Sequence, residues 1–211
     1  MYSQNNEEQI ALDYFKNADH SKMWLLDIGA NDGITYSNSK ALIDIGWNAV
    51  LLEPSPKAYR KLCETHTGKD EAVKLLNYGI NIFDGEHDFY ESGGYENGSD
   101  VALYSSVEKA EMQRWGDKVQ FEKIKADFVK WKTFLETISM VREPIFHFIS
   151  IDVEGLDWLL LNQMDLKALG CEMLVIEFNG NKDMAMNMIW HCSNYGLKEI
   201  SRNPENLIFA K

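Results

Sequence analysis

Residues Asp27-Ile28-Gly29-Ala30-Asn31-Asp32-Gly33 form a glycine-containing turn between two apolar segments. The run Met23–Leu26 before the turn is typical of a short buried strand. The spacing of apolar residues in Ala41–Ile45 after it is typical of a helix. A strand, a glycine turn and a helix in this order predict an α/β fold. The ligand is expected at the turn, against backbone N–H groups left unpaired at the start of the helix.

The acidic side chains of this turn narrow the choice of ligand. Asp27 and Asp32 would repel a bare pyrophosphate, whereas a carboxylate suits ammonium or hydroxyl groups. A dinucleotide fingerprint, G-x-G-x-x-G, needs three glycines, but the turn has only Gly29 and Gly33, with Asp27 in place of the first. The pattern D-x-G-x-x-x-G therefore favours S-adenosylmethionine, a nucleoside with an amino-acid tail, over a nicotinamide cofactor.

A second acid ends the next predicted strand, Gly46–Glu53. Glu53 stands where a carboxylate accepts hydrogen bonds from both ribose hydroxyls of a bound nucleoside. Asp27 and Glu53 taken singly are more often helix caps or solvated strand ends. Their occurrence together at this spacing favours a binding site.

The third predicted strand, Ala72–Ile80, ends near the position expected for an adenine ring. Asn77 offers amide groups to the base, and Gly79 lets a ring lie close to the main chain. An ordinary junction between strand and turn explains the same residues equally well.

Polar side chains also follow two later apolar strands. The strands are Ile145–Ile151 and Cys171–Ile176, and the polar residues are Asp152, Glu154, Glu177 and Asn179. The first of these strands is the most continuously apolar and is expected to be central. Ligands of open α/β sheets lie beyond the carboxyl ends of the strands. We therefore expect Asp152 and Glu154 to face the same cavity as Asp27.

The remaining segments predict accessory elements. A leading amphipathic helix, Glu7–Phe15, is expected to pack on the edge of the sheet or to roof the site. The Gly- and Ser-rich loop Ser92–Asp100 is a lid or a mere surface excursion. Asp127 is expected to cap a helix that runs through Phe128 to Ile138, and Leu156–Leu169 is expected to form another helix.

Composition excludes several classes of protein. The chain has 211 residues, 45% of them hydrophobic, and its net charge is −12. The length predicts a single domain, and the charge makes nucleic acid an improbable partner. No apolar run approaches the ~20 residues that cross a bilayer, and the start resembles no targeting signal, so a cytoplasmic location is expected. Cys63, Cys171 and Cys192 lack metal or disulfide spacing and are expected to be reduced thiols.

With these residues in view, the chain resembles the FkbM-type methyltransferases, a family of class I S-adenosylmethionine-dependent enzymes. The matching motifs are D-I-G-A-N-D-G at 27–33, Ser37-Asn38, G-W-x-x-V-L-x-E-P-x-P at 46–56, I-D-V-E-G at 151–155 and I-E-F-N at 176–179. The likeness covers most of residues 23–180. It is weak over residues 1–20 and over 86–143, which we expect to be a variable region that binds the substrate.

The resemblance implies a Rossmann-like, mostly parallel seven-stranded sheet with helices on both faces and an antiparallel C-terminal hairpin. It also implies a cofactor site in which Glu53 holds the ribose and Asp152 lies beneath the methionine or at the acceptor, with Glu154 near it. The residues implied at the methionine end are Asp27, Gly29, Ala30, Asn31 and Gly33, with Ser37 and Asn38 as neighbours.

The resemblance also implies the reaction: members of this family often methylate hydroxyl groups of sugars or other small metabolites, so O-methylation of such a compound is expected. Asp152 or Glu154 is the candidate base, and Ser105, Ser106, Glu177 and Asn179 are candidates for binding the acceptor. A divalent ion on Asp152, Glu177 and Asn179 is a less favoured alternative, because the spacing specifies no ligand set. Two other functions stay open: an inactive cofactor-binding or interaction module, and, less favoured, a nicotinamide-dependent oxidoreductase.

Overall fold

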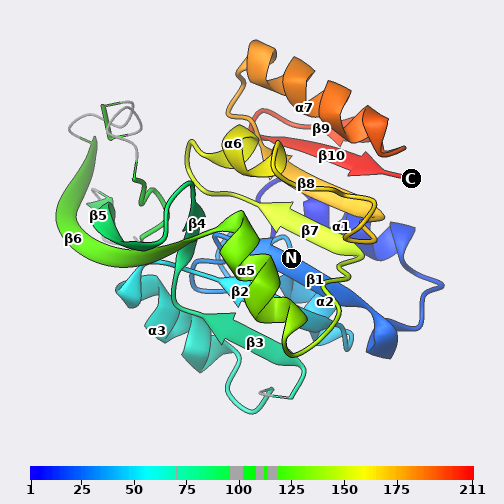
Figure 1. The fold of residues 1–211 in the computed structure, drawn as a ribbon, viewed down its shortest axis with the longest axis horizontal. Helices are drawn as coiled ribbons and strands as arrows, with labels where there is room; N and C mark the ends of the chain where they lie inside the picture. The colour runs from blue at the N-terminus through cyan, green and yellow to red at the C-terminus, as the bar shows by residue number, and fades with distance from the viewer. Residues whose placement is uncertain (70, 96–101, 108–111, 114–117) are drawn as a thin grey trace.

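The computed structural model describes residues 1–69, 71–95, 102–107, 112–113 and 118–211 (Figure 1). The helices are α1 (Glu7–Tyr14), α2 (Lys40–Asp44), α3 (Pro56–Thr65), α5 (Trp131–Ser139), α6 (Asp157–Leu161) and α7 (Lys182–Asn194), with a 3-10 turn, η1 (His20–Lys22). The strands are β1 (Trp24–Ile28), β2 (Asn48–Leu52), β3 (Val73–Leu76), β4 (Gly79–Asn81), β5 (Gly85–Tyr95), β6 (Val119–Lys130), β7 (Phe148–Ile151), β8 (Met173–Glu177), β9 (Lys198–Arg202) and β10 (Asn206–Ala210).

Seven of the described strands form one sheet in the order β3-β2-β1-β7-β8-β10-β9. Neighbouring strands from β3 to β8 run parallel, whereas β10 is antiparallel to both β8 and β9. In this register Asp27 of β1 lies between Leu51 of β2 and Ser150 of β7. The predicted Rossmann-like sheet and its antiparallel C-terminal hairpin are therefore confirmed.

Helices cover both faces of this sheet, as predicted. Side chains of β1 alternate between two hydrophobic clusters: Leu26 and Ile28 pack with α5, α6 and α7, and Leu25 packs with α1, α2 and α3. All residues of β7, β8 and β10 are buried. Strands buried on two faces need apolar residues at successive positions, which is why these three strands are apolar except at Ser150, Glu177 and Asn206.

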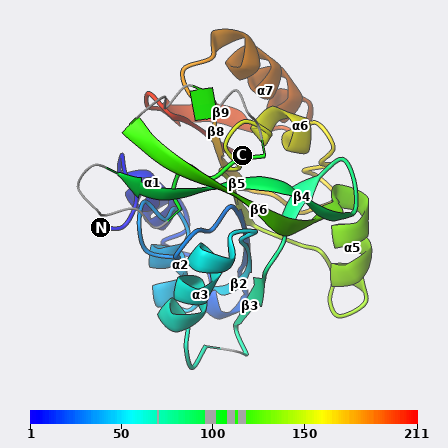
Figure 2. The ribbon, with the colours of Figure 1, turned by 90° about the vertical axis from the view of Figure 1, so that its left-hand side faces the viewer.

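A second described sheet, β4-β6-β5, is built from the region between β3 and α5. β5 and β6 pair antiparallel over almost their whole length. They form a ribbon that projects beyond the main sheet on the side to which β7 points (Figure 1), and Figure 2 shows this ribbon crossing in front of the sheet. The ribbon thus lies across the carboxyl ends of the parallel strands.

This second sheet overturns three predictions. The strand expected over Ala72–Ile80 is two strands in different sheets, because the chain leaves the main sheet between β3 and β4. Asp127 caps no helix, since it lies with Phe128 inside β6, and α5 begins only at Trp131. The loop predicted over Ser92–Asp100 begins inside β5, and its residues 96–100 lie outside the described residues.

The leading helix α1 packs on a face of the main sheet and not on its edge. Its Ala11, and Phe15 just after it, belong to the cluster that contains Phe148 of β7 and Ile208 of β10. The helix expected over Leu156–Leu169 is also shorter than predicted, since α6 ends at Leu161.

Among the helices that the structure describes, none combines the length and apolar character that crossing a bilayer requires.

Candidate active site

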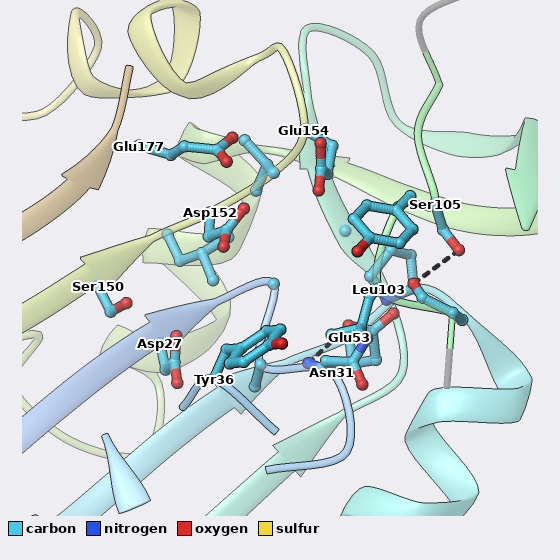
Figure 3. Close-up of a pocket in the computed structure, with 18 of the residues that line it drawn as sticks. Asp27, Asn31, Tyr36, Glu53, Leu103, Ser105, Ser150, Asp152, Glu154 and Glu177 are labelled. Atoms are coloured by element: carbon cyan, nitrogen blue, oxygen red, sulfur yellow. Dashed lines mark hydrogen bonds between the residues drawn. The ribbon is translucent and has the colours of Figure 1, made fainter. Parts of the chain in front are cut away.

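A cavity opens at the carboxyl ends of β1, β2, β7 and β8, beneath the ribbon (Figure 3). The predicted residues that line it are Asp27, Gly29, Ala30, Asn31, Ser37, Asn38, Glu53, Gly79, Ser105, Asp152, Glu154, Glu177 and Asn179. Carboxylates from three different parallel strands or their ends, those of Asp27, Glu53 and Asp152, therefore open on one space. This is the edge at which open α/β sheets bind ligands.

Asp27 is buried in the fourth position of β1, with its carboxylate toward the cavity (Figure 3). The Ser39 hydroxyl donates a hydrogen bond of 2.6 Å to its Oδ2 atom. Burial raises the pKa of Asp27 to about 6, and hydrogen bonds from Ser39 and Ser150 oppose this rise. The two serines therefore favour the charged carboxylate. Sequence reasoning missed both serines, because a lone serine gives no signal until the fold brings it to Asp27.

Glu53 follows β2 directly, and both of its oxygens accept hydrogen bonds from the main chain. The Asn31 N–H donates to Oε2 at 2.9 Å, and the Ser55 N–H donates to Oε1 at 2.7 Å. Burial raises the pKa of Glu53 to about 7 despite these two bonds, and the charge of Asp27 adds to the rise. The carboxylate is thus held in one orientation, with lone pairs left for further donors.

The backbone of the turn after β1 is tied to β2 instead of being open to a ligand. The N–H groups of Gly29 and Ala30 both donate to the carbonyl of Leu52, at 3.0 and 2.9 Å. The Asp32 carboxylate accepts from the N–H groups of Ile34 and Thr35. The expectation of unpaired N–H groups at a helix start is therefore wrong for the turn: α2 begins only at residue 40, and the N–H groups of residues 29–35 all have hydrogen-bond partners in the protein.

The turn after β1 also touches the turn after β7. Gly29 has a φ of +90°, and a Cβ atom added there would lie 1.7 Å from the carbonyl oxygen of Asp152. Only glycine permits this approach. Gly29 thereby brings the Asp27 and Asp152 carboxylates to the same cavity.

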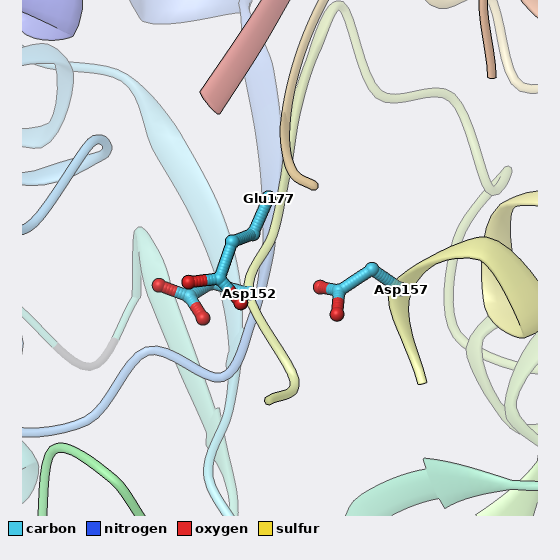
Figure 4. Close-up of side chains that lie close together, drawn as sticks. All are labelled: Asp152, Asp157 and Glu177. Carbon is cyan, nitrogen blue, oxygen red and sulfur yellow. The ribbon is translucent and has the colours of Figure 1, made fainter. Parts of the chain in front are cut away.

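Asp152 belongs to an acidic cluster with Asp157 and Glu177 (Figure 4), and one carboxylate oxygen from each residue lies within 4.8 Å of the other two. Asp157 accepts hydrogen bonds from the N–H groups of Val153 and Gly155 and so shapes the turn after β7. Asp152 is exposed through the open cavity, yet protein atoms surround its carboxylate closely enough to remove much of its hydration. That enclosure, with the charges of Asp157, Asp27 and Glu53, raises its pKa to about 8.

The ribbon and β4 supply an apolar roof over the cavity. Phe89 of β5, Phe128 of β6 and Ile80 of β4 line it. A Cβ atom added to Gly79 would lie 2.6 Å from the Phe128 ring. Gly79 is thus needed by the packing of the ribbon, a second role beside the close approach of a ligand that the sequence suggested.

An N-terminal segment, residues 2–7, closes the side of the cavity at β10. Gln4 lines the cavity together with Glu205 and Asn206. The buried Glu7 carboxylate holds this segment, because Oε1 accepts hydrogen bonds from the side chains of Asn203 at 2.7 Å and Asn206 at 2.9 Å. The expectation that the helix Glu7–Phe15 roofs the site is wrong, because none of its residues lines the cavity; the segment before it supplies Gln4 instead.

Three predicted residues do not line the cavity. Gly33 (φ +74°) faces α3, where an added Cβ atom would lie 2.7 Å from the Leu62 side chain. The Asn77 amide donates to the Glu53 carbonyl at 2.8 Å, and the Ser106 hydroxyl donates to the Glu154 carbonyl at 2.7 Å. These three residues contact the residues around the cavity and do not face the cavity themselves.

Tyr36, which the sequence did not single out, lines the cavity with a φ of +56°.

The charged side chains that line the cavity are all acidic among the described residues. Six acidic residues line it, and among the described lining residues none is lysine, arginine or histidine. The raised pKa values of Asp27, Glu53 and Asp152 come first from burial, and the charges of neighbouring acids add to the rise at Glu53 and Asp152. A ligand with an ammonium and a sulfonium group, and with ribose hydroxyls to donate, matches these acceptors. The residues present therefore fit S-adenosylmethionine.

Solved structures share the fold of this chain with little sequence identity. The methyltransferase FkbM from Methylobacillus flagellatus KT matches with a TM-score of 0.52 and 13% identity, over 94% of this chain and 46% of that chain. The N-terminal domain of human METTL16 in complex with SAH gives 0.51 and 12%, over 97% and 68%. Human methyltransferase 10 domain containing protein gives 0.51 and 10%, over 100% and 83%. This chain thus spans less than half the length of the Methylobacillus protein.

Sequence comparison settles the family. No curated protein matches the chain, but the family model described as Methyltransferase FkbM domain matches residues 27–194. That span contains Asp27, Glu53 and Asp152, the three carboxylates that open on the cavity. The resemblance noted in the motifs is confirmed: the chain belongs to the methyltransferase FkbM domain family, whose methyl donor is S-adenosylmethionine.

Proposed function

We propose that this protein transfers the methyl group of S-adenosylmethionine to a hydroxyl group of a sugar or another small metabolite. The observation that carries the proposal is that the carboxylates of Asp27, Glu53 and Asp152 line one cavity at the carboxyl ends of the parallel strands. Family membership supports the transfer, and the polar lining of the cavity supports an acceptor with hydrogen-bonding groups.

The donor side of the cavity is formed by residues of β1, β2 and the turns that follow them. In the proposal Asp27 accepts a hydrogen bond from the ammonium group of the cofactor, and Glu53 accepts from its ribose hydroxyls. The Asn31 N–H donates a hydrogen bond to the Glu53 carboxylate and so keeps that carboxylate in place. The turn from Gly29 to Asn31, with Ser37 and Asn38 beside it, surrounds the methionine end.

When bound, S-adenosylmethionine supplies the methyl carbon: the acceptor oxygen bonds to it as the carbon–sulfur bond breaks and its electron pair stays on sulfur. Such an in-line displacement depends more on positioning than on strong acid–base catalysis. The acceptor hydroxyl still loses its proton, and Asp152 is the proposed base, with Glu154 as the alternative. With a pKa of about 8, Asp152 holds a proton strongly and is ionised, as a base must be, in a growing fraction of molecules as the pH rises through 8.

Calorimetric titration with S-adenosylmethionine tests the donor side. Asp27→Ala should weaken binding at least about tenfold, since a charge-assisted hydrogen bond contributes on the order of 1.5–3 kcal/mol. Asp88→Ala is the matched control, because Asp88 lies on the ribbon, pairs with Lys123 and Lys125 and does not line the cavity. Unchanged affinity in Asp27→Ala would remove Asp27 from the cofactor site.

Transfer itself is tested by turnover with S-adenosylmethionine labelled in its methyl group. Asp152→Asn should lower kcat about a hundredfold or more, because a general base contributes at least that factor. Tight cofactor binding without transfer to any hydroxyl compound would instead support the inactive cofactor-binding module.

A further inference from the structure

We propose that the methyl acceptor carries a positive charge, such as a protonated amine beside the hydroxyl that is methylated, and that the cavity excludes anionic acceptors. This inference rests on the proposed methyltransferase function and deepens it, because it names the chemical class of the second substrate.

The order of the strands divides the cavity into two ends. Glu53 follows β2, and Glu205 and Asn206 stand at the start of β10, with β1, β7 and β8 between them. In the proposed function the cofactor occupies the end formed by β2 and β1. The acceptor therefore lies at the opposite end, from Asp152 to β10, where Asn206 is paired with Glu177 of β8.

Acidic groups dominate the acceptor end. Asp152 and Glu205 line it, and the described residues around them include no basic side chain that lines the cavity. The Glu205 carboxylate accepts one hydrogen bond, from the Asn5 side chain at 2.9 Å, and that donor is neutral. Glu154 and Glu177 line the same end. Even if they are left out of the count, and Asp152 is taken as mostly protonated, the Glu205 carboxylate leaves this end negatively charged.

The cofactor does not neutralise this excess. Its sulfonium and ammonium groups, less its carboxylate, bring one net positive charge. Asp152, with a pKa of about 8, is mostly protonated at neutral pH, but Asp27, Glu53 and Glu205 line the same cavity, so negative charge still exceeds positive charge. Like charges in an enclosed site repel more strongly than in water. A phosphate or carboxylate on the acceptor would meet that repulsion with no described lining cation to offset it, whereas an ammonium group would be attracted.

Methyl transfer into fractionated metabolites tests the inference. A cell extract is separated by ion exchange into cationic, neutral and anionic small molecules, and each pool is incubated with the protein and methyl-labelled S-adenosylmethionine. Label should enter the cationic pool at least about tenfold more than either other pool. Label mainly in the anionic or the neutral pool would overturn the inference. No label in any pool, from protein that binds the cofactor, would overturn the proposed transfer and the acceptor class with it.

A charge variant sharpens the result. Glu205→Gln should raise the KM of the labelled cationic acceptor about threefold to tenfold with cofactor affinity unchanged, as expected when one nearby charge is removed. Glu64→Gln removes the same charge from the exposed surface of α3, outside the cavity, and should leave that KM unchanged. An equal KM in Glu205→Gln and the wild type would contradict a role for charge at the acceptor end.

Discussion

Gly29 and Asp152 belong to different turns, yet a Cβ atom added to Gly29 would lie 1.7 Å from the Asp152 carbonyl oxygen. The turn after β1 is therefore pressed against the turn after β7. Because these turns carry Asp27 and Asp152, the distance between the proposed donor site and the proposed base depends on this contact.

Gly29→Ala is expected to destabilise the fold by about 3 kcal/mol or more and to abolish cofactor binding, because the methyl group overlaps main-chain atoms that must move. Urea unfolding and calorimetry measure the two effects. Gly46→Ala is the matched control: Gly46 also has a positive φ, +104°, but has no atom within 4 Å of an added Cβ. It should lose only about 1–2 kcal/mol, the cost of the backbone conformation. Equal losses in the two variants would argue against the contact.

Ser39→Ala should raise the pKa of Asp27 above its value of about 6, because the serine hydroxyl favours the charged carboxylate. Cofactor affinity should fall about tenfold near neutral pH. Calorimetry over a pH series should show binding that strengthens only at higher pH than in the wild type. Ser193→Ala, on the exposed side of α7, serves as the control. A lower affinity with an unshifted pH profile would make Ser39 a packing residue only.

The ligand-free protein should lose stability as the pH rises from about 5 to 9. Folding raises the pKa of Glu53 from 4.5 to about 7, so the folded state holds its proton more tightly. The stability that this group contributes is present below pH 4.5 and is lost as the pH rises through 7. The loss from Glu53 is on the order of 3 kcal/mol, and Asp27, with a pKa of about 6, adds to it.

Urea unfolding at several pH values measures this slope. Glu53→Gln should flatten it, because the amide does not titrate, while an exposed control, Glu136→Gln, should leave it unchanged. Cofactor should stabilise the wild type more at pH 8 than at pH 6, since ionised carboxylates attract its cationic groups. A stability that rises from pH 5 to 9 without ligand would contradict the raised pKa values.

Glu7→Ala should destabilise the protein by about 2–4 kcal/mol, because the side chains of Asn203 and Asn206 would lose a buried acceptor. Hydrogen exchange of the Asn5 and Glu8 amides should accelerate, since Glu7 holds this segment. Gln9→Ala, on the exposed side of α1, should change stability by less than about 0.5 kcal/mol. Slow exchange retained in Glu7→Ala would show that other contacts hold the segment.

The parts of this fold that the sequence predicts best are the buried parallel strands. β7 and β8 are apolar except at Ser150 and at the terminal Glu177, because helices cover both sides, so their course and the acids at and after their ends could be recognised. Asp27, Glu53 and Asp152 were expected at one edge on this basis, and they do line one cavity.

The ribbon and the N-terminal segment could not be predicted in the same way. Phe128, Trp131 and Phe134 are spaced like one face of a helix, yet Phe128 belongs to β6 and packs in a cluster with Phe89. Local spacing cannot reveal this, because the packing partner lies on a distant strand. The bond between Glu7 and Asn206 joins residues 199 positions apart, a separation that no local pattern reports.

The ribbon of β5 and β6 has one further consequence. It leaves the main sheet after β3 and rejoins the body of the protein at α5, while the strands that carry Asp27, Glu53 and Asp152 are paired with one another and not with it. The roof is in this sense an interchangeable part. A ribbon of different length and side chains could be grafted onto the same main sheet. The engineered enzyme would then methylate new acceptors while its binding site for the methyl donor stays unaltered.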